Sequence, residues 1–262
     1  RGGVTIRSSM KRVLTILTIL CLAGCGADDS GQSGANTADT VATVPLPGIV
    51  LQGDKQRAGD PKLGYKHLVN SDYVRCGVPY SAYKAAFGNS DLGPKLPGRE
   101  GLNADLPFFS TAFKTDSGVD VVAPNCLTCH AEMLEGKLVV GLGTVTQDFT
   151  VDLAAVAALS GLLVKDGPEK EEWKKWNSRV QAIGPYIQAL VVGVNMADNM
   201  ASALWAHRDP KTLNWSDEPL MEKPPKMVVP VDVPPWWRMG KKATMFYTGA
   251  GRGDHARIMM TA

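Results

Sequence analysis

The feature that most constrains the fold is a five-residue stretch near the middle of the chain, Cys126-Leu127-Thr128-Cys129-His130. Two cysteines separated by two residues, with a histidine directly after the second, form the C-x-x-C-H pattern that attaches c-type haem. The two thiols add to the haem vinyl groups, and the histidine can reach the iron from the proximal side. The pattern predicts one covalently bound haem, held by Cys126, Cys129 and His130. The haem then contributes a large apolar face to the core.

Two other interpretations of this stretch stay open. A redox dithiol also uses C-x-x-C, but it is not usually followed by histidine in a chain without the strand-first thioredoxin pattern. Half of a zinc site would need two more cysteine or histidine ligands nearby. The other histidines, His67, His207 and His255, are all distant in the sequence. We therefore prefer covalent haem.

The segment 10–25 has the order of an export signal. A short basic start at 10–12 is followed by the apolar run 13–20 and then by Leu22-Ala23-Gly24-Cys25. The last four residues resemble a bacterial lipobox, in which the cysteine becomes the lipidated N-terminus. The alternatives are an ordinary signal peptide or a membrane helix, but the apolar run is short for a bilayer span. We expect a lipoprotein signal peptide at 10–25, with the residues 1–9 upstream of the true start.

Export and lipidation at Cys25 imply a location and a compartment. We expect the chain on the periplasmic side of a bacterial membrane, attached through that lipid. The residue after Cys25 is Gly26 and not an aspartate, which leaves the outer membrane open as the destination. The compartment should be oxidising, which suits a c-type haem because this haem is attached outside the cytoplasm. Cys21 is removed when the signal peptide is cleaved. We expect Cys76 to be a small buried apolar residue.

The remaining chain divides into a linker and a domain. Residues 26–44 are small and polar without an aromatic side chain, which predicts a flexible linker. Residues 45–262 should form the haem domain, which we expect to be incomplete at its C-terminal end. The chain has 28 Lys and Arg against 26 Asp and Glu, so its charge gives no reason to expect a nucleic-acid partner.

Helical periodicity after the cysteine motif predicts a mainly α fold with a long irregular N-terminal region and a few short strands. Together with the C-x-x-C-H motif, it implies a cytochrome-c-like helical domain. Strands are expected within 105–124 and 136–144. The expected helices are, in chain order, 61–70, 79–87, 151–165, a segment that starts at Pro168, and 185–206. Pro168 suits the first helical turn, as do the acidic residues Glu169, Glu171 and Glu172.

The sixth iron position is the open question, because a methionine, a histidine, water or no ligand at all would each favour a different chemistry. Candidates by residue type are Met196, Met200, Met239, Met245, His255, Met259 and Met260. Each of them, taken singly, suits a structural role better than a ligand role. We select His255 and Met245 as the leading distal candidates.

The C-terminal stretch is rich in aromatic residues. Pro234-Pro235-Trp236-Trp237 is followed by Phe246-Tyr247-Thr248-Gly249 and then by Gly251-Arg252. Adjacent tryptophans are costly to leave in water, so they should pack against a flat apolar surface. The triplet Arg252-Gly253-Asp254 also matches an adhesion motif, but so short a match carries little information.

With C-x-x-C-H upstream, this stretch resembles the bacterial di-haem cytochrome c peroxidase superfamily, which includes the MauG-type enzymes and the rubber oxygenases. Only C-x-x-C-H is a specific match. Tyr247 stands where that family usually has tryptophan, and Thr248 where it has aspartate. The tryptophan pair is more similar to the oxygenase branch, where aromatic side chains line the distal side of the first haem. The resemblance spans about 120–260 and implies a second haem domain in the full-length protein.

The resemblance implies a haem oxidoreductase of the peroxidase or oxygenase type, with electron transfer through the haem. Its expected partner is a redox protein or a small-molecule oxidant. Trp236, Trp237, Phe246 and Tyr247 are then the candidate residues of the catalytic site. One alternative is a lipid-anchored cytochrome c that only carries electrons, although such carriers are usually shorter. Another is a binding module in which the haem is structural.

Overall fold

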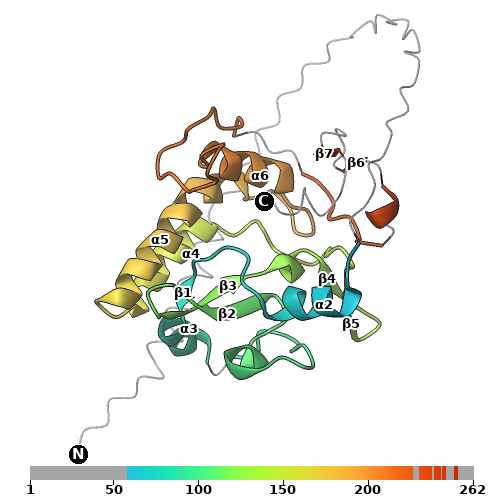
Figure 1. The fold of residues 1–262 in the computed structure, drawn as a ribbon, viewed down its shortest axis with the longest axis horizontal. Coiled ribbons are helices and arrows are strands. Elements are labelled where there is room, and N and C mark those ends of the chain that lie inside the picture. Colours follow the sequence, from blue (N-terminus) through green and yellow to red (C-terminus); the bar gives the residue numbers. More distant parts are fainter. Residues whose placement is uncertain are drawn as a thin grey trace, which may run out of the picture. The chain divides into compact units, whose positions relative to one another are not determined.

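The computed structural model describes residues 58–88, 90–226, 230–237, 239–242, 244–245 and 251–252 (Figure 1). All of them belong to one unit, Val50–Ala262. The expected signal peptide, the lipidation residue Cys25 and the linker 26–44 lie outside the described residues. So do His255 and the aromatic candidates Phe246 and Tyr247, together with the side chain of Met245.

The fold is mixed α/β, so the prediction of a mainly α domain is wrong. Helices make up 38% and strands 14% of the described residues. The described helices are α2 Pro61–Asn70, α3 Tyr80–Phe87, α4 Leu153–Ser160, α5 Pro168–Ile183 and α6 Ala197–Ala206. The described strands are β1 Val78–Pro79, β2 Ser110–Lys114, β3 Asp120–Pro124, β4 Ala131–Leu134, β5 Lys137–Val140, β6 Thr244–Met245 and β7 Gly251–Arg252. The physical reason is that apolar segments form two separate sheets, one from strands before the cysteine motif and one from strands directly after it.

The central sheet lies before the cysteine motif and has the order β1-β3-β2 with antiparallel neighbours (Figure 1). Its inner face packs Leu106, Ala112 and Val122 into one buried cluster. Asn103, in the 3-10 helix η1 (Gly101–Asp105), donates to the Ala112 carbonyl at 2.9 Å and accepts from the Ala112 N–H at 2.7 Å. That side chain replaces a missing strand on the free edge of β2, because it satisfies both backbone groups of Ala112. The predicted strand region 105–124 is confirmed.

A second sheet, the hairpin β4–β5, begins directly after the cysteine motif. Its two turn residues, Glu135 and Gly136, have φ values of 50° and 75°. Two consecutive positive φ angles are typical of a two-residue hairpin turn whose twist matches that of the strands. The predicted strand at 136–144 is therefore present but ends at Val140. The hairpin fixes the direction in which the chain leaves the motif.

The short helices predicted at 61–70 and 79–87 are confirmed by α2 and α3. Asp60 caps α2, because its carboxylate accepts from the N–H groups of Lys62 and Leu63. The helix predicted to start at Pro168 is confirmed by α5, which packs against β1. Cys76 is buried, as expected.

Two helix predictions need correction. The helix expected at 151–165 is shorter, since α4 ends at Ser160 and continues as the 3-10 helix η3 (Gly161–Leu163). The helix expected at 185–206 is wrong over its first half. There the 3-10 helix η4 (Gly184–Tyr186) leads into non-helical chain, and α6 begins only at Ala197.

The reason lies in backbone hydrogen bonds to the segment 147–149. The Ala189 N–H donates to the Phe149 carbonyl at 2.8 Å, and the Gly193 N–H donates to the Gln147 carbonyl at 3.1 Å. Gly193 has a φ of 89°, which a right-handed helix does not allow. Within the described part of the chain, no helix is both long and apolar enough to span a bilayer.

Candidate functional site

The cysteine motif forms a hydrogen-bonded turn at the end of the central sheet. Residues Cys126–Thr128 make the 3-10 helix η2, which follows β3 directly. Asn125 caps the turn, because its side-chain oxygen accepts from the Leu127 N–H at 2.9 Å. The Asn125 amide also donates to the Phe108 carbonyl and to Thr111 Oγ1, at 3.0 and 2.9 Å. Leu127 is fully buried, so the turn is fixed from its inner side.

The two cysteines of the motif carry free, partly exposed thiols. Burial raises the pKa of Cys126. Burial, with a smaller contribution from the charge of Cys126, raises the pKa of Cys129 to about 11. Catalytic dithiols usually have a lowered thiol pKa, because the thiolate is the reactive species. The environment of the turn therefore disfavours the redox-dithiol interpretation.

The His130 imidazole is neutral and has an unpaired buried nitrogen. Burial lowers its pKa to about 4, although the nearby Pro234 carbonyl acts in the opposite direction. Nδ1 is buried without a hydrogen-bond partner among the described residues. Buried polar atoms are rarely left unsatisfied, and such an atom in a native structure calls for an explanation. A neutral imidazole with an unpaired nitrogen has the protonation state that iron ligation requires.

Trp236 covers the ring of His130. The two rings are stacked, with centroids 4.7 Å apart and an interplanar angle of 26°. The chain reaches this position through Gly141, whose N–H donates to the His130 carbonyl and whose carbonyl accepts from the Trp236 N–H, both at 2.8 Å. Gly141 has a φ of 90°, which favours glycine. The structure thus brings together two predicted site residues, while Trp237 is 55% exposed.

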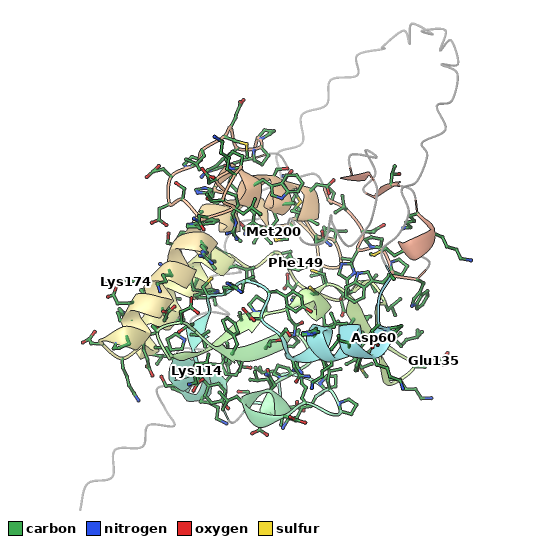
Figure 2. The ribbon with its side chains drawn as sticks, in the orientation of Figure 1. Asp60, Lys114, Glu135, Phe149, Lys174 and Met200 are labelled. Atoms are coloured by element: carbon green, nitrogen blue, oxygen red, sulfur yellow. The ribbon has the colours of Figure 1, made fainter. Side chains whose placement is uncertain are left out.

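An apolar cluster lies beside Cys129. Phe149, Met196 and Ala189 are buried there, and Cys129 and Met200 pack against them. Figure 2 labels Phe149 and Met200 within this group. Of the methionines considered as distal ligands, Met196 and Met200 are therefore the ones that the structure places in a cluster with a motif residue.

Glu132, two residues after the motif, ties the next loop to the hairpin. Its Oε2 accepts from Thr144 Oγ1 and Thr146 Oγ1, each at 2.8 Å, and from the N–H groups of Val145 and Thr146 at 3.0 and 3.2 Å. Burial would raise the pKa of this carboxyl, but the hydrogen bonds lower it to about 2. The Thr144 N–H donates in turn to the Cys129 carbonyl at 2.9 Å.

Sequence reasoning missed Glu132, and it also missed Tyr73. Burial, followed by the charge of Cys126, raises the pKa of Tyr73 to about 12. The phenol is therefore electrostatically coupled to Cys126, the first cysteine of the motif. No local sequence signal identifies either residue, because each reaches the motif through a turn of the chain.

The zinc interpretation finds no further ligands in the described structure. Among the described residues, no three His, Cys, Asp or Glu side chains are placed to hold one metal ion. His67 contacts Ser71 Oγ at 3.0 Å, and His207 stacks on Trp215. A cavity of about 480 Å³, lined by α3 and Leu106, does not include the motif residues in its wall.

The chain matches no family model, and it matches no curated protein and no solved structure among those compared.

Proposed function

We propose that the chain is an exported c-type haem protein with one covalently bound haem, attached at Cys126 and Cys129 and ligated by His130. The observation that carries this proposal is the placement of His130. Its ring is stacked on Trp236, its Nδ1 is buried without a partner among the described residues, and it follows the second of two free thiols on one turn. These features fit the C-x-x-C-H attachment chemistry.

Haem c would supply one-electron exchange at its iron and, where a coordination position is open, peroxide or oxygen chemistry. The chain's own residues would do the rest. Cys126 and Cys129 would fix the macrocycle at two points of one turn, and the cluster around Phe149 would exclude water beside Cys129. Stacking on Trp236 would hold the imidazole of His130 in one orientation.

We further propose that the activity is that of a haem oxidoreductase of the peroxidase or oxygenase type. Trp236 contacts the proposed iron ligand, and the adjacent Trp237 is exposed. The pair would give electrons a short path between the haem and a redox partner at the surface. A full-length protein with a second haem would deliver electrons to the first.

A second candidate function, an electron carrier without substrate chemistry, is favoured by one observation. Met196 and Met200 lie in the cluster that contacts Cys129, where a thioether sulfur could become the distal ligand. A methionine opposite a histidine is the usual ligand set of electron-transferring cytochromes c.

The proposed location is the periplasmic side of a bacterial membrane, through a lipid on Cys25. Mass spectrometry of the N-terminal peptide after expression in a Gram-negative bacterium should show a diacylglycerol-modified Cys25. The Cys25→Ser variant should lose that modification. An unmodified Cys25 in the mature chain would contradict the anchor but not the haem.

The haem is tested by expressing the chain in a bacterial periplasm with haem-attachment machinery. A denaturing gel stained for haem should show a band at the mass of the chain. The Cys126→Ala, Cys129→Ala variant should lose the band, while Cys76→Ala, a matched cysteine change outside the motif, should keep it. A chain without covalent haem would refute the proposal.

The oxidised and reduced visible and EPR spectra then separate the two functions. A high-spin ferric signal favours peroxide or oxygen chemistry. A low-spin signal with the near-infrared band of His/Met ligation favours the carrier, and that band should disappear in Met200→Leu or in Met196→Leu.

A further inference from the structure

A cavity of about 350 Å³ lies beside the segment 72–75, between the last part of α5 and the chain that follows α6. Its wall contains three cationic side chains and one acidic side chain. The lining residues that matter here are Asp72, Tyr73, Arg75, Arg179, Arg208 and Trp215. The ionised side chains sum to a charge of +2. Neither the thioether attachment nor the iron ligation of the proposed haem uses these charged side chains.

Two of the guanidinium groups lie over the same indole ring. The Arg179 guanidinium is 5.4 Å from the Trp215 ring centroid, and that of Arg208 is 5.6 Å from it. A guanidinium within about 6 Å of an indole centroid is attracted to the ring, so both groups are held beside Trp215. Arg179 also donates to the Val74 carbonyl at 3.0 Å, and Arg208 donates to the Leu213 carbonyl at 3.1 Å. The two cations are thus positioned by backbone and by ring contacts.

The paired guanidinium groups lack a direct counter-ion. Among the described residues, no carboxylate lies within 4.0 Å of Arg179 or Arg208, and Asp72 contacts Arg75 instead at 3.8 Å. Glu172 and Asp217 interact with Arg179 at longer range. Burial, followed by the charge of Arg179, lowers the pKa of Arg208. Two like charges held together on one ring are costly unless an anion joins them.

The rim of the cavity is conformationally strained. Arg75 and Leu213 both line it, and their φ values are 50° and 59°. Such angles are uncommon outside glycine and cluster at ligand sites. His207 stacks under Trp215 at 4.8 Å, is 1% exposed, and its Nε2 has no partner among the described residues. Together these features indicate an organised binding site rather than a shallow depression of the surface.

We infer that this cavity binds a dianionic group, either two carboxylates or one phosphate, between Arg179 and Arg208. Planar guanidinium groups bind both kinds of oxyanion in a bidentate way. The anion could come from two sources. The two propionates of a haem attached at the cysteine turn are one source, and that assignment rests on the proposed function. A free anion such as phosphate is the other.

The first test uses the haem-free full chain and inorganic phosphate, so it does not depend on the haem proposal. Thermal unfolding is measured with phosphate and with chloride at the same ionic strength, and ³¹P NMR follows binding directly. We expect phosphate at ten times its Kd to raise the Tm by about 3–5 °C more than chloride. Arg208→Gln should abolish this difference, and Arg208→Lys should retain part of it.

Lys174→Gln is the matched control, because Lys174 is an exposed cation on α5 that pairs with Glu171 at 2.8 Å. It should keep the full phosphate effect. The inference is overturned if phosphate and chloride act alike on the unaltered chain. It is also overturned if Arg208→Gln, or Arg179→Gln where Arg208→Gln does not fold, keeps the effect of the unaltered chain.

The source of the anion follows from repeating the measurement on the haem-loaded chain. If haem attachment abolishes the phosphate effect, the propionates occupy the cavity. If the effect persists at the same phosphate concentration, the ligand is a free anion. A chain that never takes up haem would refute the proposed function, and the phosphate result would still stand.

Discussion

The loop after the hairpin should depend on a single carboxylate. Replacing Glu132 with glutamine keeps the size of the side chain but removes its charge and replaces one acceptor with an amide. In the native chain Oε2 accepts four hydrogen bonds from Thr144, Val145 and Thr146, and Oε1 accepts from the Met133 N–H at 2.8 Å. We expect Glu132→Gln to destabilise the fold and to free this loop.

The magnitude follows from the pKa of Glu132. A fall from 4.5 to about 2 corresponds to an upper limit of about 3.4 kcal/mol, at 1.36 kcal/mol per unit. Because the carboxylate is largely accessible to water, we reduce this to about 1–2 kcal/mol. For a chain of this size, that loss should lower the Tm by about 2–8 °C.

The pH dependence supplies a second check. A carboxyl whose pKa is lower in the folded chain stabilises it fully above the unfolded value, and this stabilisation is lost as the pH falls through the folded value. The Tm difference between the native chain and Glu132→Gln should therefore be full at pH 7 and should shrink between about pH 4.5 and pH 2.

The assay is thermal unfolding of the haem-free chain, with hydrogen exchange of the Thr144 amide as a local measure. Glu135→Gln is the matched control, because Glu135 lies at the turn of the same hairpin (Figure 2). It should change the Tm very little. The reasoning is refuted if the two variants are equally stable at pH 7.

Three further predictions concern His130, Gly143 and Asn103. The haem-free chain should lose up to about 3 kcal/mol of stability as the pH falls from 6.5 to 4, because His130 is protonated at a higher pH in the unfolded chain than in the folded chain. An NMR titration that gives a pKa near 6.5 for this ring would contradict its burial. Gly143→Ala should cost about 1–3 kcal/mol, since the new methyl group meets the Val233 carbonyl and displaces the segment that carries Trp236. That displacement should also expose His130 and raise its pKa, and an unchanged pKa would contradict this prediction. Asn103→Ala should cost about 2–4 kcal/mol in urea unfolding, because it leaves two buried backbone groups of β2 unpaired. Asn70→Ala, at a partly exposed position at the end of α2, should cost far less, and equal costs would disprove the role.

Local signals explain the parts of the fold that the sequence predicts well. Asp60 and Pro61 define the start of α2, and Gly167 and Pro168 define the start of α5. The false helix before α6 shows the limit of such signals. Ile187, Leu190 and Val194 recur at helical spacing, but Gly193 and the backbone bonds to 147–149 impose a non-helical path of turns and bends.

The sequence identifies the candidate attachment residues but not their surroundings. The C-x-x-C-H spacing is local, whereas the contact of Trp236 with His130 requires the chain to return through Gly141. The pairing of Arg179 with Arg208 is also non-local, because two arginines in separate segments carry no pattern that predicts a shared ring. The predicted fold class is wrong for a similar reason, since strand pairing depends on partners elsewhere in the chain.

The hydrogen bonds by which Gly141 joins His130 to Trp236 bear on the order of haem attachment and folding. If the chain crosses the membrane from its N-terminal end, as we propose, the cysteine turn emerges before the tryptophan that later covers its histidine. The motif would then be open to the attachment machinery during a brief interval of translocation, and docking of Trp236 would close it. Slower delivery of the C-terminal segment should therefore increase the yield of haem-loaded protein, and a chain that is fully folded before it meets the machinery should be a poor substrate.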